Sequence, residues 1–415
     1  MHKEIKGSNI VDVRLVLRAG QAYDHKVGVP AGTAHFLEHI VHEKTEKYAG
    51  RDELLSIIAP KGGLRNAGTY TSEKMDFFAT VLKDEAEHAA DYVSQIVCHA
   101  ILTDEAVEKH RSIIEQEYFS KFKDPQVKCH LGFKELAFEG FGLEFMALGD
   151  LDGIKKITKA DLQNFYDSRF KAENASLSIY GDISFEEAEG LAKKYFMKMK
   201  TSIPFSENNK FEYEKYEIGL DKIDSKEKVF KHIEIKEDQA VVFFGGMNLG
   251  RSAFNQYPLR VLLHMLAGDY TSILYKILRD EKHLLYGVSF AQSATDGVGT
   301  HAISMNIAPA NIQTSLNIIV DEINKIAEGN IDEERITLVK SRTKAREIFN
   351  QQSVQSQADS DGTIKLLFLD LKDNDEYLAK IDAVTKEEVI EAAKYLKDHM
   401  NLLSVCSNKK EEYTF

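Results

Sequence analysis

Residues 102–117 read LTDEAVEKHRSIIEQE, and residues 330–347 read NIDEERITLVKSRTKARE. Both stretches begin with acidic residues and continue with apolar and charged positions at helical spacing. The two stretches align when Asp104 is placed on Asp332. A pattern that returns after a long interval indicates internal duplication of a structural unit. The alternative interpretation is two unrelated α/β domains.

The segments around these two stretches also follow one another in a similar order. Residues 10–18 alternate apolar and polar positions, with Val11, Val13, Leu15 and Leu17 in phase, which predicts a half-buried strand. The first half is further predicted to hold helices at 34–47, 84–101, 104–122 and 185–197, a turn and strand or hairpin within 60–80, and a strand at 175–181. The second half is predicted to hold strands at 239–245, 285–291 and 300–307, and helices at 258–281, 310–328 and 332–350.

This order of elements predicts the fold class and the domain organisation. We expect an α+β protein with two homologous α/β-sandwich domains, each an antiparallel-rich sheet covered by helices. The N-terminal domain is placed at residues 1–205 and the C-terminal domain at 231–415. Residues 206–230 are polar and charged with little helical period, and are therefore interpreted as the connection between the domains.

The composition indicates which binding partners are disfavoured and which cellular compartment suits the protein. The 415 residues include 53 Lys and Arg against 66 Asp and Glu, a net charge of −13, which disfavours nucleic acid and anionic membranes as partners. The three cysteines, Cys98, Cys129 and Cys406, contain no CxxC pair, which disfavours a disulfide framework and is typical of the reducing cytoplasm. No apolar stretch approaches the ~18 residues of a membrane span, and the N-terminus lacks the apolar core of a signal peptide.

The sequence AHFLEH at residues 34–39 carries the clearest chemical signal. His35 and His39 are four residues apart, so on a helix they lie on one face and can hold one zinc ion. Glu38 flanks that face and can take a proton from water without binding the metal. Taken alone, the string also suits a helix whose histidines serve only surface or capping purposes. A His39–His42 pair would leave Glu38 on the wrong side, so His42 is interpreted as a packing residue or a neighbour of the ligands.

A catalytic zinc site needs a third protein ligand and a position left open for water. The predicted helix 104–122 offers Glu115 and Glu117, which point in nearly opposite directions because they are two residues apart. Glu117 follows Ile113 and Ile114 by four and three residues, and so projects from the apolar face. A carboxylate on a buried face needs a cation or a metal as its partner. Glu117 is therefore favoured over Glu115, which lies on a polar stripe.

With these residues in place, the chain resembles the inverzincin family of zinc peptidases, which includes pitrilysin, insulysin and mitochondrial processing peptidase. That family shows HxxEH followed, further along the chain, by a helix that ends in a ligand Glu. Here the stretch HRSIIEQEY matches that second helix and places the ligand on Glu117. The chain departs from the family pattern at His110, where a carboxylate is usual, and at His42, where an aromatic residue is usual.

The resemblance extends over residues 30–400 through several segments in order. These are GTAHFLEH, GGLRNAGTYTS, KADLQNFYDSRFKAENASLSIYGDIS and YTSILYKILRDEKHLLYGVSF. The second segment resembles the family's edge strand, which implies that Asn66, Ala67 and Gly68 bind the substrate backbone. The last segment keeps the family's Arg–Tyr pair as Arg279 and Tyr286. Without the resemblance, this pair reads as an ordinary helix end with a solvated Arg and a half-buried Tyr.

The resemblance implies a zinc endopeptidase with one Zn²⁺ per chain, held by His35, His39 and Glu117. Glu38 would act as the general base, Tyr286 would stabilise the oxyanion and Arg279 would anchor substrate carbonyls. The substrates would be extended, unfolded peptides or leader segments, cut inside a closed chamber. The chamber would be formed by a homodimer or by a heterodimer with a related chain.

Further implications concern the second half and the competing functions. With Asp104 placed on Asp332, the ligand positions fall on Leu263, Ala267 and Ala345, so the second half is expected to bind no metal. The main alternative function is a non-catalytic, accessory peptide-binding subunit of a heterodimeric peptidase. A structural or storage zinc site is a further alternative, and it would require a fourth ligand.

Overall fold

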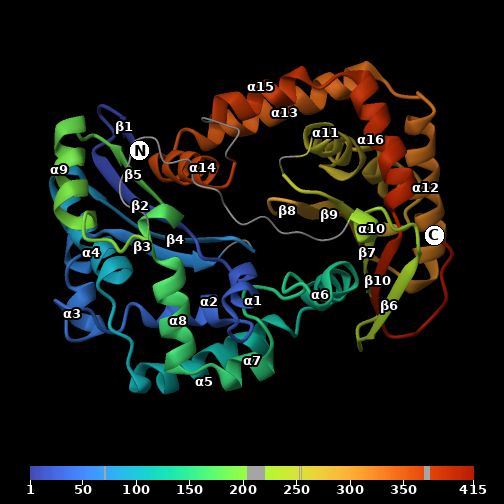
Figure 1. Cartoon of the computed structure of the whole chain (residues 1–415). Coiled ribbons are helices and arrows are strands. Elements are labelled where there is room, and N and C mark those ends of the chain that lie inside the picture. Colours follow the sequence, from blue (N-terminus) through green and yellow to red (C-terminus); the bar gives the residue numbers. More distant parts are fainter. Residues whose placement is uncertain (70–71, 203–219, 252, 254, 369–373) are drawn as a thin grey trace. The chain divides into compact units, whose positions relative to one another are not determined.

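Helices and strands are grouped into two units in the computed structural model, which describes all residues except 70–71, 203–219, 252, 254 and 369–373 (Figure 1). Unit 1 consists of Met1–Tyr118, Phe145–Tyr213 and Glu347–Asn374. Unit 2 consists of Phe119–Glu144, Glu214–Arg346 and Asp375–Phe415. Both units are thus discontinuous along the chain, whereas the predicted domains are continuous. Residues 206–219 of the predicted connection lie outside the described residues.

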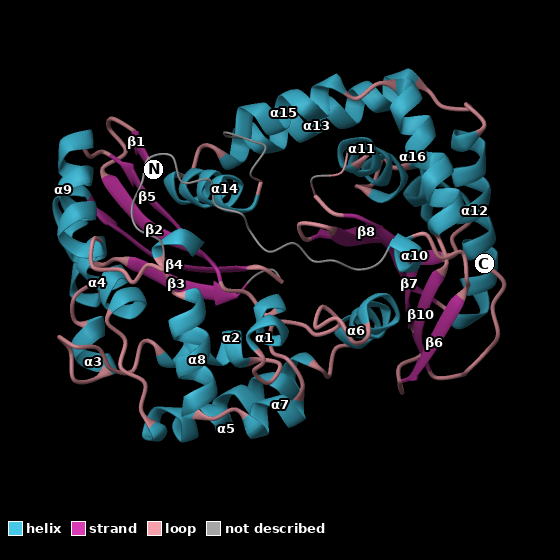
Figure 2. Cartoon of the chain, in the orientation of Figure 1, coloured by secondary structure: helices cyan, strands magenta, loops and turns pink. Residues whose placement is uncertain are grey.

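Unit 1 contains a five-stranded sheet with the order β1-β5-β2-β4-β3. The strands are β1 (His2–Glu4), β2 (Ile10–Arg18), β3 (Leu64–Thr69), β4 (Lys74–Leu82) and β5 (Ala175–Gly181). Among the described strand pairs of this sheet, β1–β5 is parallel and the other three are antiparallel. Helices α4 (Ala86–Cys98) and α9 (Phe185–Phe196) lie on one side of this sheet, and α14 (Val354–Leu367) lies on the other (Figure 2).

Strand β2 shows why both faces of this sheet are covered. Val11, Val13 and Leu15 are fully or almost fully buried on the face that packs against α4, as their period-two spacing predicts. The opposite face carries Asp12 and Arg14, and it is buried as well, because α14 packs against β2 and β5. The prediction of a half-buried strand was therefore wrong: its polar face meets a helix rather than water.

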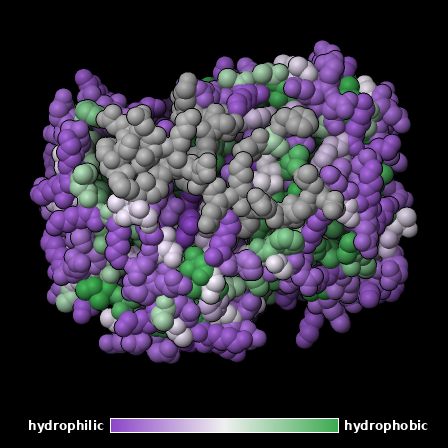
Figure 3. All heavy atoms as spheres, in the orientation of Figure 1, coloured by the Kyte–Doolittle hydropathy of each residue, from purple (hydrophilic) through white to green (hydrophobic). Residues whose placement is uncertain are grey.

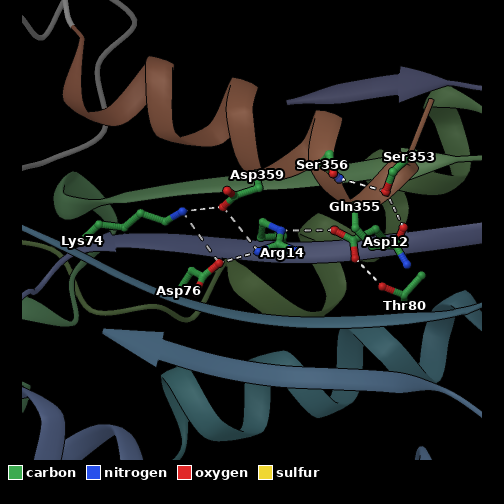
Figure 4. Close-up of polar contacts among 9 residues, drawn as sticks. All are labelled: Asp12, Arg14, Lys74, Asp76, Thr80, Ser353, Gln355, Ser356 and Asp359. Carbon is green, nitrogen blue, oxygen red and sulfur yellow. Dashed lines mark hydrogen bonds and ion pairs between the residues drawn. The ribbon is translucent and has the colours of Figure 1, made fainter. Parts of the chain in front are cut away.

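The covered polar face forms a network of charged side chains (Figure 4). Arg14 pairs with Asp12, with Asp76 and, from α14, with Asp359. Lys74 also pairs with Asp359 and Asp76. Asp12 accepts a further hydrogen bond from the Thr80 hydroxyl at 2.6 Å. Buried charges are tolerated only when they are paired and hydrogen-bonded in this way, and the network fixes α14 on the sheet.

Unit 2 repeats this architecture with the sheet order β6-β10-β7-β9-β8. Its strands are β6 (Val229–Glu234), β7 (Ala240–Leu249), β8 (Leu285–Ala294), β9 (Val298–Ile307) and β10 (Leu402–Ser407). One face forms a core with α11 (Gln256–Ala267), α12 (Ile312–Ala327) and α16 (Lys386–His399). The other face is covered by α6 (Pro125–Phe138), whose Cys129 Sγ lies 3.2 Å from the carbonyl oxygens of Val241 and Ser404.

The matching strand orders confirm the predicted α+β architecture of two homologous units. The two long helices of the opening pattern are α5 (Asp104–Lys121) and α13 (Glu333–Asn350). Each unit also receives one covering helix from the other half of the sequence, since α6 belongs to unit 2 and α14 to unit 1. The remaining helices are α1 (Ala22–Val27), α2 (Thr33–Ile40), α3 (Arg51–Leu55), α7 (Leu151–Lys156), α8 (Lys159–Arg169), α10 (Leu220–Ile223) and α15 (Asn374–Ala383).

The surface is mainly hydrophilic where Figure 3 shows described residues, and apolar side chains form only small groups there. Across the part of the chain that the structure describes, no helix combines the length and the apolar character that crossing a bilayer requires.

Candidate metal centre

Helix α2 presents the HxxEH residues on the side that its apolar residues leave free. Phe36, Leu37 and Ile40 are fully buried, so His35 and His39 fall on the opposite, partly exposed side. The helix ends at Ile40 rather than at residue 47 as predicted. The reason is a tertiary contact, because the chain after the helix forms a β-bridge between Thr45 and Ala100.

The start of α2 is held by Asp24 of α1. Its carboxylate, 2% exposed, accepts hydrogen bonds from the backbone N–H groups of Gly32 at 2.8 Å and Ala34 at 2.9 Å. These contacts satisfy N–H groups that lack partners within the helix. The helix is capped by Gly32 at a φ of +95°, and a Cβ at this position would lie 2.6 Å from the Leu148 carbonyl oxygen. Thr33 is the first residue of the helix, one position before the predicted start at residue 34.

Helix α5 brings Glu117 to the two histidines. Its Oε2 lies 3.4 Å from His35 Nε2 and 3.6 Å from His39 Nε2. The orientation of α5 follows from Ile114, one turn before Glu117, which is 1% exposed. Ile113 was also used to place Glu117 on the apolar face of this helix. In the structure it is 43% exposed and does not contribute to the buried side.

The donor set suits a zinc ion. Within the described residues, His35, His39 and Glu117 are the one group of His, Cys, Asp or Glu side chains whose ligand atoms all lie within 4.8 Å of one another. Ligand atoms at about 2.0–2.1 Å from a common tetrahedral ion are about 3.3 Å apart, close to the separations of Glu117 from both imidazoles. Two imidazole nitrogens and one carboxylate oxygen are a common ligand set of catalytic zinc. The other ring nitrogen of His35, Nδ1, is buried and lies 3.6 Å from Glu38 Oε2.

The side chains of this site favour a positive charge between them. Burial lowers the pKa of His35, but the carboxylates of Glu117 and Glu38 outweigh burial and raise it to about 9. Burial and the positive charge of His35 lower the pKa of His39 to about 4. One positive charge is therefore held between two carboxylates, in the place that a metal ion would take.

Zinc uptake is accordingly expected to depend on pH. Since the folded pKa of His35 is about 9, His35 is protonated at pH 7, and zinc must displace about one proton to bind. The apparent zinc affinity should fall by up to about tenfold for each pH unit below 9. Titration calorimetry in two buffers with different ionisation enthalpies measures the released proton. Identical binding enthalpies in both buffers would contradict this expectation.

Thr69 is a residue of this site that the sequence did not reveal. Its hydroxyl, at the end of β3, donates a hydrogen bond of 2.8 Å to Glu38 Oε2. The same carboxylate oxygen lies 3.6 Å from His35 Nδ1. Glu38 is thus held from two sides, and its orientation depends on the strand that packs against α2. The sequence analysis predicted only that the segment GGLRNAGTYTS binds the substrate backbone. No rule of sequence spacing connects Thr69 with Glu38, so this hydrogen bond could not be predicted.

Removing the Thr69 hydroxyl is expected to lower kcat for the peptide cleavage that the family resemblance implies. In Thr69→Val, the side chain keeps its shape but loses the donor to Glu38, and kcat should drop by about ten- to a hundred-fold. Thr69→Ser should restore most of the loss, while zinc content stays the same in all three proteins. Steady-state kinetics separates kcat from KM in this series. Equal losses in both variants would show that the methyl group, not the hydrogen bond, matters.

The two histidines that depart from the family pattern have other partners. His42 is 8% exposed and its Nδ1 lies 3.2 Å from the Tyr92 hydroxyl, in line with a packing role. Burial lowers the pKa of His42 to about 3, so it stays neutral. His110 is 2% exposed, and its Nε2 lies 2.8 Å from Glu43 Oε1. Its ring centroid is 5.8 Å from that of His39, so His110 packs beside the candidate ligand group, which consists of His35, His39 and Glu117.

The predicted substrate-binding residues lie on β3, at the edge of the unit 1 sheet. Asn66, Ala67 and Gly68 pair on one side with Phe78, Phe77 and Asp76 of β4. The other side of β3 has no neighbouring strand in the described sheet. Asn66 is exposed, Ala67 is partly exposed and Gly68 is buried.

Arg279 and Tyr286 belong to unit 2 and form a pair of their own. Arg279 lies on the π-helix Tyr275–Glu281, and its Nη1 donates to the Tyr286 carbonyl oxygen at 2.7 Å. Its guanidinium lies 4.9 Å from the Tyr286 ring centroid and 5.0 Å from that of Tyr275. The Tyr286 residue is 76% exposed, so its hydroxyl is not committed to the core.

Two family models match the chain. The model described as "Insulinase (Peptidase family M16)" matches residues 2–131. The model described as "Peptidase M16 inactive domain" matches residues 156–343. The first match contains α2, β3 and Glu117 of α5, and the second contains the π-helix and β8.

Relatives and solved structures of similar sequence or fold extend over most of the chain. An uncharacterized zinc protease of Mycobacterium leprae is 23% identical over 86% of this chain and 78% of its own length. The mitochondrial-processing peptidase subunit beta of Saccharomyces cerevisiae is 25% identical over 88% and 79%. The crystal structure of a protease from Helicobacter pylori aligns with a TM-score of 0.85 at 17% identity, covering 97% and 95% of the two chains.

Proposed function

The chain belongs to the M16, or insulinase, family of peptidases, and on that premise we propose that it is a zinc-dependent endopeptidase that cuts extended, unfolded peptides. The observation that carries the proposal is the convergence of His35, His39 and Glu117, with Glu38 beside them. His35, His39 and Glu117 would hold one Zn²⁺ per chain. Bound zinc supplies Lewis-acid polarisation of the scissile carbonyl and a lowered pKa of the attacking water.

The side chains of the protein perform the proton transfers. Glu38, next to the ligands and held by Thr69, takes a proton from the attacking water and passes it to the leaving amine. A carboxylate suits this role because its two oxygens can accept and then release the proton without moving the helix. Tyr286 is proposed to donate its exposed hydroxyl to the developing oxyanion, and Arg279 to bind substrate carbonyls.

The edge strand β3 is proposed to hold the substrate. Strand β3 is the last strand in the order of the described sheet, and the backbone around Asn66, Ala67 and Gly68 is proposed to pair with an added peptide strand. Such pairing depends on the backbone of the substrate more than on its side chains, and it requires the peptide to be extended. Since β3 ends at Thr69, which contacts Glu38, a bound strand would run directly toward the general base.

We further propose that the chain works as a dimer in the cytoplasm. One relative is named as the beta subunit of a processing peptidase, which supports assembly with a second chain. A homodimer that forms a closed chamber is the simplest arrangement, because this chain carries both the HxxEH residues and the Arg–Tyr pair. A heterodimer with a related chain is the other arrangement. The three unpaired cysteines suit a reducing compartment.

Cleavage of one polypeptide in two folding states tests the proposed substrate class. The zinc-loaded chain is incubated with a small disulfide protein in its native form, and with the same protein reduced and alkylated. New termini, identified by mass spectrometry, are expected only for the unfolded form. Equal cleavage of both forms would contradict the requirement for an extended peptide. If neither form is cut, the accessory-subunit alternative takes precedence.

A further inference from the structure

His110 lies on the same helix as the candidate ligand Glu117 and is buried beside the candidate ligand His39. His110 and Glu117 are seven positions apart on α5, which is about two helical turns, so both project from one side of the helix. His110 is 2% exposed, and its ring centroid lies 5.8 Å from that of His39, with the two ring planes at 69°. The helix that brings Glu117 to the site thus also brings an imidazole to the second histidine.

One ring nitrogen of His110 binds a carboxylate. Its Nε2 lies 2.8 Å from Oε1 of Glu43, which belongs to the turn after α2. Glu43 also accepts hydrogen bonds from Lys109 Nζ at 2.6 Å and from Arg51 Nη1 at 3.4 Å. Burial would raise the pKa of Glu43, but the hydrogen bonds from Lys109 and His110 lower it to about 2. Glu43 is therefore ionised at neutral pH, and its carboxylate can only accept hydrogen bonds.

The other ring nitrogen of His110 is left as a buried acceptor. Because the carboxylate of Glu43 accepts at Nε2, the hydrogen of the neutral imidazole lies on Nε2, and Nδ1 carries a lone pair. Nδ1 is buried, and in the part of the chain that the structure describes it has no hydrogen-bond partner. Buried polar atoms in folded proteins are normally hydrogen-bonded. The position of Nδ1 therefore indicates a donor that joins it in the working protein.

His39 can supply this donor. Its Nε2 lies 3.6 Å from Glu117 Oε2, so Nε2 is the nitrogen that faces the proposed metal position. A neutral imidazole that binds a metal through one nitrogen carries its hydrogen on the other, and ligand histidines usually donate this N–H to a fixed acceptor. Among the described residues, none forms a hydrogen bond with His39 Nδ1. His39 and His110 are thus neighbouring rings, one with a spare donor and the other with a spare acceptor.

We propose that His110 and Glu43 orient the zinc ligand His39 through a chain of two hydrogen bonds. In the zinc-loaded protein, His39 Nδ1–H donates to His110 Nδ1, and His110 Nε2–H donates to Glu43. Small rotations of the two neighbouring rings bring the nitrogens together, and the ionised carboxylate at the end strengthens the chain. The proposal rests on the proposed function, since it takes zinc to bind at His35, His39 and Glu117. His110 and Glu43 are positioning residues, because they act through His39.

This arrangement gives a role to the histidine at position 110, where a carboxylate is usual in the family. In this chain the carboxylate stands one side chain further from the candidate ligands, on Glu43. The imidazole of His110 connects that carboxylate to His39, and its Nδ1 can accept a hydrogen bond as a carboxylate oxygen would. The departure from the family pattern thus keeps an acceptor beside His39.

The zinc affinity of four variants tests this proposal, measured by competition with a chromophoric chelator. His110→Phe keeps a planar ring but removes the acceptor. His110→Gln keeps an acceptor toward His39 and a donor toward Glu43, and Glu43→Gln removes the charge at the end of the chain. His99→Phe is the matched control, because His99 forms a separate pair with Glu46, with Nδ1 2.9 Å from Oε2.

The expected result is a graded loss of affinity. His110→Phe should bind zinc about 10- to 100-fold more weakly than the wild type. Glu43→Gln should lose less, about three- to tenfold. His110→Gln should restore most of the loss seen in His110→Phe, and His99→Phe should bind zinc as the wild type does. Recovery with Gln identifies the hydrogen bonds as the cause, since a packing role of the ring would not be restored by an amide.

Two results would overturn the proposal: wild-type zinc affinity in His110→Phe, or equal losses in His110→Phe and His110→Gln. Thermal unfolding of the metal-free proteins shows which variants fold. If His110→Phe does not fold, Glu43→Gln decides, and an unchanged affinity in that variant overturns the proposal. Tight zinc binding by the wild type and by every variant would refute this hydrogen-bond chain alone. A wild-type chain that binds no zinc would refute the proposed metal site together with it.

Discussion

Glu38→Gln is expected to lower kcat/KM for peptide cleavage by about two to four orders of magnitude. Gln has the shape of Glu, so the side chain still reaches Thr69 and the helix still presents His35 and His39. It cannot accept the proton of the attacking water, however, and general base catalysis is lost. The zinc content should stay at one ion per chain, because Glu38 is not among the three proposed ligands. Steady-state kinetics with a fluorogenic peptide and metal analysis of the same sample measure both quantities.

A matched carboxylate separates this effect from a general loss of charge. Glu46 lies shortly after α2, and its side chain is 69% exposed and paired with His99. Glu46→Gln should cut peptides at the wild-type rate. A Glu38→Gln protein as active as the wild type would remove Glu38 from the mechanism. A variant that loses zinc together with activity would instead indicate that Glu38 supports the ligands.

Glu117→Gln is expected to produce the second large effect, a loss of zinc affinity. Loss of a group that merely supports a ligand costs about 10- to 100-fold in metal affinity, so loss of a ligand should cost more than about 100-fold. The carboxylate of Glu117 lies 3.4 and 3.6 Å from the two imidazoles, and an amide oxygen without charge replaces it poorly. Competition with a chromophoric chelator gives the affinity, and peptide cleavage should fall in parallel.

The adjacent acidic residue provides the control for this prediction. Glu115 is two residues away on the same helix, so its side chain points in a different direction. Glu115→Gln should keep both zinc affinity and activity. Retained zinc in Glu117→Gln with lost zinc in Glu115→Gln would reverse the assignment of the third ligand. Retained zinc in both would place that ligand elsewhere.

The elements with strong local patterns could be predicted from the sequence. Strand β2 and strand β5 begin and end where the alternation of apolar residues begins and ends. Helix α5 was predicted to within a residue, because its first turn is acidic and its charged positions repeat at helical spacing. The same pattern, repeated in α13, revealed the duplication. In these segments the local preference and the tertiary packing agree.

Features that depend on contacts distant in sequence could not be predicted. The exchange of α6 and α14 leaves no periodic signal, because each helix buries its face against a sheet from the other half of the chain. The charged face of β2 looked solvent-exposed for the same reason, since its partner Asp359 is 345 positions from Arg14. The early end of α2 depends on the bridge between Thr45 and Ala100. Each of these features can be recognised only when the three-dimensional fold is known.

The candidate site divides in the same way. The His35–Glu38–His39 spacing encodes its own geometry, since one helical turn brings the three side chains together. Glu117 could be identified because the buried side of α5 and the family resemblance agreed. The hydrogen bond from Thr69 to Glu38 and the contact of Asp24 with the start of α2 connect separate elements. No local sequence pattern predicts them.

Removal and return of zinc tests the central claim most directly. A mixture of unstructured peptides is incubated with the purified chain, with the chelated chain, and with the chelated chain after one equivalent of Zn²⁺ has been added. New peptide termini are identified by mass spectrometry, with Glu38→Gln as a parallel sample. The account predicts cleavage by the untreated and the zinc-restored chain, and none by the chelated chain or the variant. Cleavage that persists without zinc, or in Glu38→Gln, would contradict it.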